Sequence, residues 1–186
     1  MSTILSYKIH TVTPYINWIY FFHAWGFQPR YAAIANIHGC DACRAMWLAS
    51  FPVEERNKAS EAMQLFKEAN RMLDVLDRDY EVRTIFKLCK ANSDGDNLVI
   101  EKAENQFMVF PLLRQQTPKK DGSPFLCLSD FIRPLSSGIP DTLGAFASSI
   151  DADMEGLYEQ DPYKHLLVQT LSDRLADCLL YTSDAA

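Results

Sequence analysis

The chain has 186 residues, of which 48% are hydrophobic and 23% charged, and its formal net charge is −6. This is the composition of an ordinary globular domain, and it excludes a disordered or collagen-like chain. The acidic balance argues against binding to a nucleic-acid backbone, and no segment approaches the ~18 apolar residues of a transmembrane helix. Lys8 and His10 interrupt the segment where a signal peptide needs an apolar run. We therefore expect a cytoplasmic protein with no membrane or nucleic-acid partner, whose five cysteines are reduced thiols.

The first half of the chain has helical periodicity. Trp18, Phe21, Phe22 and Trp25 have the i, i+3, i+4, i+7 spacing of one helix face. A second stripe follows Pro52 and continues to about Asp79, and it predicts a long amphipathic helix. Its apolar positions are Met63, Phe66, Ala69, Leu73 and Leu76.

The pattern changes to strands after Tyr80. Residues 82–88, 97–100 and 106–110 read as three strands, and their short separations favour an antiparallel meander. Residues 92–96 form a turn cluster, which is a better match to a hairpin than to a twelve-residue calcium loop. Residues 143–147 are apolar, and the small residues among them allow close packing, so the segment predicts a buried inner strand.

A further helix is expected to begin at Asp161-Pro162, with aspartate as the cap and proline in the first position. Its apolar face continues through Leu175 and Cys178. Helices flanking an antiparallel sheet predict an α+β domain. We assign residues 1–177 to this domain and expect residues 178–186 to be a non-native or truncated tail.

His38, Cys40 and Cys43 form an HxCxxC cluster. Cysteines at this spacing on a turn can bind zinc or exchange between thiol and disulfide. A closed tetrahedral site needs four ligands, and the next cysteine, Cys89, is distant in sequence. Buried thiols in the turn Gly39–Cys43 are therefore the leading interpretation, and a metal- or redox-responsive site is the alternative.

Other polar residues are less specific. Arg114, with Gln115 and Gln116, places hydrogen-bond donors at the end of a strand. Asp130 lies in an apolar stretch, so we expect a buried carboxylate that caps a turn or pairs with Arg114 or Arg133. Asn17 lies within the aromatic segment and either satisfies backbone groups or faces a ligand.

Several different short segments follow one another along the chain. Taken together and in this order, they are specific for one family. They are Tyr15-Ile16-Asn17-Trp18 with Phe21-Phe22 and Trp25, Leu65-Phe66-Lys67-Glu68-Ala69-Asn70-Arg71-Met72-Leu73, Ala91-Asn92-x-x-Gly95-Asp96, Leu113-Arg114-Gln115-Gln116, Cys127-Leu128-Ser129-Asp130-Phe131, Gly144-Ala145-Phe146 and Asp173-Arg174-Leu175-Ala176. In this order, from about Val12 to Ala176, the chain resembles the S-adenosylmethionine-binding activation domain of cobalamin-dependent methionine synthase. The cysteine-containing stretch around His38 resembles an insertion relative to that domain.

The resemblance implies a C-shaped α+β fold with a twisted antiparallel sheet, incomplete at the C-terminus of this chain. It implies a reactivation module that binds S-adenosylmethionine and supports reductive methylation of cob(II)alamin to methylcobalamin in methionine biosynthesis. The cobalamin would be held by a partner methionine synthase module, and a flavodoxin-like donor would supply an electron. Such a domain is an accessory to a methyltransferase, and no independent catalytic centre or catalytic residue is assigned.

The resemblance also implies two ligand-binding positions, and both depart from the family pattern. The carboxylate that meets the ligand's ammonium group in the family falls on Asn17, which is an amide. The family's glutamate after Arg-Leu-Ala falls on Asp177, one methylene shorter. The Arg-Pro-Ala-x-Gly-Tyr-Pro loop of the family is absent from this sequence. The alternative function is a metal- or redox-responsive binding protein that uses His38, Cys40 and Cys43.

Overall fold

The structure is a computed structural model that describes residues 3–103, 106–118, 122–154 and 156–182. The chain divides into two compact units. The sheet unit comprises Met1–Thr3 and Ile85–Ala147, and the helical unit comprises Ile4–Thr84 and Ser148–Ala186.

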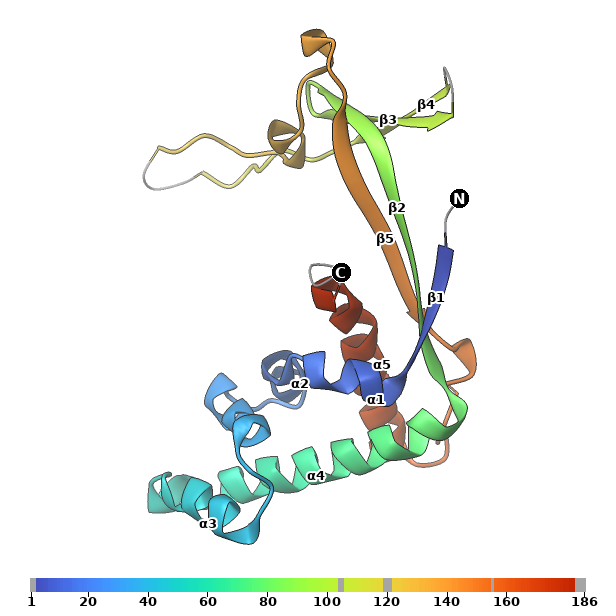
Figure 1. The fold of residues 1–186 in the computed structure, drawn as a ribbon. Coiled ribbons are helices and arrows are strands. Elements are labelled where there is room, and N and C mark those ends of the chain that lie inside the picture. Colours follow the sequence, from blue (N-terminus) through green and yellow to red (C-terminus); the bar gives the residue numbers. More distant parts are fainter. Residues whose placement is uncertain (1–2, 104–105, 119–121, 155, 183–186) are drawn as a thin grey trace. The chain divides into compact units, whose positions relative to one another are not determined.

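Helices and 3-10 turns make up most of the helical unit (Figure 1). The α-helices are α1 (Ile9–Val12), α2 (Trp18–Ala24), α3 (Asp41–Ala49), α4 (Arg56–Asp79) and α5 (Pro162–Thr182). The 3-10 helices are η1 (Thr13–Tyr15), η2 (Pro29–Asn36), η3 (Val53–Glu55) and η6 (Ala152–Met154). None of the helices among the described residues has the length and hydropathy needed to cross a bilayer.

The aromatic segment forms the helix that its spacing predicts. Phe21 and Phe22 are fully buried, and Trp18 and Trp25 pack against the same core from more accessible positions. Pro14 lies in the preceding 3-10 turn η1. Residues in the first turn of a helix have no hydrogen-bond partner for their N–H within the helix, so proline removes no hydrogen bond there. The helix prediction for this segment is therefore confirmed.

Helix α4 provides the longest face of the core. The side chains of Ala69, Leu73 and Leu76 are buried, as the stripe predicts, while Met63 and Phe66 are partly buried. The α-helix begins at Arg56 rather than at Pro52, because the residues between them form the 3-10 turn η3.

Helix α5 closes the helical core. Asp161 accepts a hydrogen bond from the backbone N–H of Lys164, which confirms the predicted cap. Leu171 and Leu175 are fully buried and Cys178 is 2% exposed, so the predicted apolar face is confirmed. The segment 178–186, expected to be a tail, begins inside α5; residues 183–186 lie outside the described residues.

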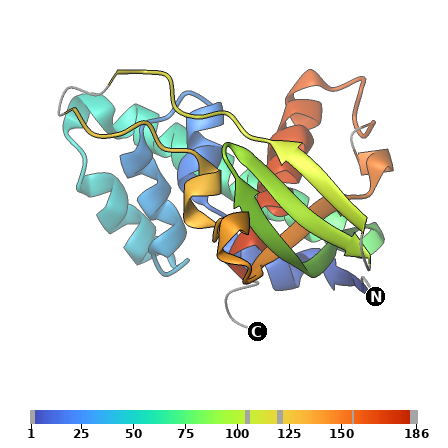
Figure 2. The same cartoon turned by 90° about the horizontal axis from the view of Figure 1, so that it is seen from above.

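The sheet is antiparallel along the chain from β2 to β4, as the short connections predict. Its strands are β1 (Thr3–Lys8), β2 (Glu81–Asp94), β3 (Asn97–Ala103), β4 (Gln106–Pro111) and β5 (Asp141–Ile150). The strand order is β1-β2-β3-β4, and β5 pairs with β2. Strands β2, β3 and β4 lie side by side in both views (Figures 1 and 2).

In the sheet unit, the predicted hairpin is confirmed and the predicted buried strand is only partly correct. The turn cluster is a hairpin: Asp94 pairs with Asn97 across the two residues Gly95 and Asp96. The prediction of a buried inner strand is wrong in one respect, since β5 is a strand but Leu143 is half-buried and Gly144–Ala147 are exposed. The small residue at 144 does permit close packing, because a Cβ there would lie 3.2 Å from the Phe86 ring.

Candidate functional site

Asn17 satisfies a backbone group, which is one of the two roles that its sequence position left open, and it also lines a cavity. It is the N-cap of α2, and its side-chain oxygen accepts a hydrogen bond from the backbone N–H of Ile19 at 3.1 Å. This bond satisfies one of the donors that a helix start leaves without a partner. Asn17 also lines a cavity of about 540 Å³. The other lining residues are Tyr15, Ile16, Trp18, Ile19, Pro29, Arg30, Ala32, Ala33 and Asn36.

The bond to Ile19 determines which part of the Asn17 amide is available to a ligand. Its oxygen is engaged in the cap, and among the described residues its nitrogen has no hydrogen-bond partner. The amide therefore offers its N–H donors and the second lone pair of its oxygen, but it lacks the negative charge that attracts an ammonium group. Arg30 lines the same cavity and is held by Glu55 at 2.8 Å.

Asp177 lies near the end of α5, and its carboxylate pairs with Arg174 at 2.8 Å. The Arg174 guanidinium lies 5.6 Å from the centre of the Tyr20 ring in α2. About one α5 turn earlier, Thr170 accepts a hydrogen bond from the Trp25 indole at 3.1 Å.

These contacts show that α2 and α5 pack in opposite directions. Trp25, after the end of α2, contacts Thr170, whereas Tyr20, near the start of α2, contacts Arg174, one turn later in α5. Asn17 lies three residues before Tyr20, and Asp177 lies three residues after Arg174. The structure therefore brings the two predicted ligand positions to the same end of one helix pair.

Arg114 is the centre of a second polar cluster, within the sheet unit. Its guanidinium donates to both oxygens of Asp130 at 2.7 and 2.8 Å, and to Asp96 at 2.7 and 3.0 Å. It also donates to the backbone oxygen of Phe125 at 2.7 Å. These charge-assisted bonds hold the hairpin turn and the 3-10 turn η4 (Leu128–Phe131) together.

The expectation of a buried carboxylate at Asp130 is wrong, because the residue is exposed. It nevertheless performs both predicted tasks, pairing with Arg114 and accepting the backbone N–H of Cys127 at 2.8 Å. The hydrogen bonds from Arg114 lower the pKa of Asp130 to about 2. The role of Asp96 was missed, because a partner 18 residues from Arg114 leaves no local signal in the sequence.

The HxCxxC cluster differs from the predicted turn, because Cys40 is the N-cap of α3 and Cys43 lies in its first turn. The Cys40 sulfur accepts the backbone N–H of Cys43 at 3.4 Å. The ligand atoms of His38, Cys40 and Cys43 all lie within 4.8 Å of one another. All five cysteines of the chain are free thiols, and Cys40 and Cys43 are half-buried. The hydrogen bond with His38 lowers the pKa of Cys40 to about 7.

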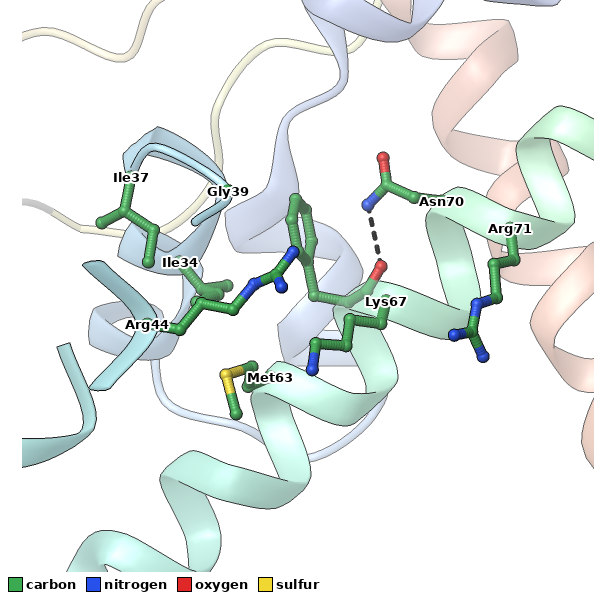
Figure 3. Close-up of a pocket in the computed structure, with 9 residues that line it drawn as sticks. Ile34, Ile37, Gly39, Arg44, Met63, Lys67, Asn70 and Arg71 are labelled. Carbon is green, nitrogen blue, oxygen red and sulfur yellow. Dashed lines mark hydrogen bonds between the residues drawn. The ribbon is translucent and has the colours of Figure 1, made fainter. Parts of the chain in front are cut away.

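A basic cavity of about 340 Å³ adjoins this cluster at Gly39, the residue between His38 and Cys40. Figure 3 shows Arg44 reaching in from α3, with Lys67 and Arg71 on α4. Its apolar walls are Ile34, Ile37, Met63 and Phe66.

The chain combines α-helices with an antiparallel β2–β4 sheet and is therefore an α+β protein, with a cavity of small-molecule size beside the start of α2. Residues 8–180 match the family described as vitamin B12 dependent methionine synthase, activation domain. The chain belongs to this family.

A solved structure supports the same assignment. The crystal structure of the MetH reactivation domain bound to AdoHcy is 32% identical in sequence and superposes with a TM-score of 0.70. The match covers 97% of this chain and 53% of that one, so this chain spans about half the length of the solved relative.

Proposed function

We propose that this chain binds S-adenosylmethionine and serves as the reactivation module of a cobalamin-dependent methionine synthase. The observation that carries the proposal is the match over 97% of the chain to a reactivation domain bound to AdoHcy. AdoHcy is the product that S-adenosylmethionine leaves after it donates its methyl group, so one pocket would accommodate both.

The helix pair of α2 and α5 supports a ligand site at its Asn17 end. Asn17 and Asp177 share that end, and the cavity that Asn17 lines is about 540 Å³, within the usual range for small-molecule pockets. Asp177 offers a carboxylate that is about half exposed and that pairs with Arg174 at 2.8 Å. We assign Asn17 to the neighbourhood of the ligand's ammonium group and Asp177 to a second polar contact with the same ligand.

The chemistry assigned to the module is a reductive methylation. The partner module's cobalamin, after receiving one electron from a flavodoxin-like donor, would accept the methyl group of the sulfonium as its carbon–sulfur bond breaks, and AdoHcy would remain as the product. This chain's part is to bind and orient the sulfonium ligand, because a fixed geometry removes much of the entropy barrier of methyl transfer.

Calorimetric titration with AdoHcy and with S-adenosylmethionine tests ligand binding. We expect one site per chain and a loss of affinity of roughly 10- to 150-fold in Asp177→Ala, the range for a hydrogen bond to a charged group. Asp173→Ala is the matched control, because this exposed carboxylate lies one turn earlier on α5. Absence of heat and of thermal shift with either ligand, in the folded wild-type protein, would refute the binding proposal.

The partner is tested separately. A cobalamin-loaded methionine synthase module in the cob(II)alamin state is mixed with this chain, S-adenosylmethionine and reduced flavodoxin. We expect the electron paramagnetic resonance signal of cob(II)alamin to disappear and the absorption of methylcobalamin to replace it. A signal that persists while ligand binding is intact would refute the reactivation role alone.

A further inference from the structure

We propose that His38, Cys40 and Cys43 form a zinc site with two thiolates and one imidazole, whose fourth position takes water or an external ligand. The site is separate from the Asn17 end of α2 and α5. It does not depend on S-adenosylmethionine binding.

The geometry needs little adjustment to bind the ion. Typical bonds are about 2.3 Å for zinc–sulfur and about 2.0–2.1 Å for zinc–nitrogen. In a tetrahedron these lengths place two sulfurs and one nitrogen roughly 3.5–3.8 Å apart. The three ligand atoms here already lie within 4.8 Å of one another, so small side-chain rotations bring them onto one ion.

Both sides of the short HxCxxC segment are anchored in the core. Before it, Ile34 in η2 is 3% exposed. After it, Trp47 in α3 is 8% exposed and meets the Phe51 ring edge-on, with centroids 4.9 Å apart. A rigid frame on each side lowers the entropy lost when the ligands converge, which favours metal binding.

The donor set selects the kind of metal. Two sulfurs and an imidazole suit a borderline-soft cation such as Zn²⁺, whereas Mg²⁺ and Ca²⁺ require oxygen ligands.

The charge of the surroundings agrees with this choice. Zn²⁺ bound by two thiolates and a neutral imidazole carries no net charge. It therefore adds no positive charge next to Arg44, Lys67 and Arg71, which line the adjoining cavity (Figure 3). The same three cations would favour an anionic molecule in the fourth position.

The test uses the full chain, reduced and freed of metal by a chelator. Zn²⁺ is titrated in competition with a chromogenic chelator, and Co²⁺ is used as a spectroscopic substitute. We expect one zinc per chain, and with Co²⁺ the sulfur-to-cobalt charge-transfer absorption together with visible bands of tetrahedral intensity. Mg²⁺ at the same concentration should not compete.

Variants assign the ligands. Cys40→Ser and Cys43→Ser should each abolish stoichiometric zinc binding, and His38→Ala should weaken it while leaving the charge-transfer absorption in place. Cys89→Ser is the matched control, because Cys89 is a half-buried thiol in β2. Circular dichroism of each variant establishes that it is folded.

Three outcomes overturn the proposal. The first is a folded, reduced wild-type protein that binds no zinc at micromolar free metal. The second is zinc binding that Cys40→Ser and Cys43→Ser leave intact. The third is a Cys40–Cys43 disulfide that forms in air in a protein that binds no zinc when reduced, which would make the cluster a redox pair.

Discussion

Substitution of Asn17 by alanine separates the structural role of this residue from its role toward a ligand. The alanine removes the acceptor of the 3.1 Å bond from the Ile19 N–H, while α2 keeps its buried residues Phe21 and Phe22. Loss of such a cap costs about 1 kcal/mol of unfolding free energy. In a domain of this size that corresponds to a melting temperature lower by about 2–4 °C. Urea unfolding measures the free energy, and we expect the midpoint to fall with the slope unchanged.

Asn17→Asp changes the ligand contact without removing the cap. The carboxylate still accepts the Ile19 N–H, and its negative charge suits a helix N-terminus. The carboxylate has a second oxygen that can accept a hydrogen bond from an ammonium group. The amide has a single oxygen, which the Ile19 N–H already engages. A gain of about 1–3 kcal/mol corresponds to roughly 5- to 150-fold tighter S-adenosylmethionine binding by calorimetry. The matched control is Asn57→Asp, the same change at an exposed position in the first turn of α4.

Two results would refute this reasoning. An Asn17→Ala protein as stable as the wild type would show that the cap contributes nothing to the stability of α2. An Asn17→Asp protein that binds no more tightly than Asn57→Asp would show that residue 17 does not meet the ligand's ammonium group.

Further predictions concern the core, the Arg114 cluster and the hairpin. Leu171→Ala in the α5 core should lower the unfolding free energy by about 2–5 kcal/mol, whereas Leu166→Ala, on the half-exposed face of the same helix, should change it by less than about 1 kcal/mol; both are measured by urea unfolding. Asp130 has its pKa lowered from 3.8 to about 2, so its contribution to stability is present above pH 4 and is lost as the pH falls through 2. In Arg114→Ala, carboxyl-carbon NMR should find this pKa shifted back toward 3.8, and an unchanged value would contradict the assigned cause. Gly95→Val should destabilise the hairpin by about 1–2 kcal/mol in thermal unfolding, because φ there is +59° and a Cβ meets no atom within 4 Å, so the cost is that of the backbone conformation.

Sequence periodicity predicted the helices that bury a continuous apolar face. Helix α5 is an example, since Asp161 caps it and Leu171 and Leu175 are buried as their spacing requires. Helix α3 was missed, because polar and small residues around Gly39–Cys43 read locally as a turn and only one of its residues, Trp47, is buried. The burial of β5 was predicted wrongly, because small apolar residues indicate a strand but do not reveal whether another layer covers it.

The candidate sites also differ in how much of each could be predicted from the sequence alone. The HxCxxC cluster could be found from its spacing, because all three residues lie within six positions of the chain. The Arg114 cluster could be found only in part, since the choice between Arg114 and Arg133 as the partner of Asp130 depends on long-range folding. Family resemblance identified Asn17 and Asp177, but only the antiparallel packing of α2 and α5 shows that they share one end of a helix pair.

Strand β4 ends the strand order of the sheet, and each of its residues is exposed. Phe107 and Val109 are 62% and 56% exposed, so the strand presents apolar side chains together with its outer backbone groups. An edge of this kind is a template onto which another strand can add, and proteins usually protect it with charge or proline. In this strand the protection among the described residues is Pro111, which terminates it. The exposed edge of β4 therefore has the features of an edge onto which a further strand could pair.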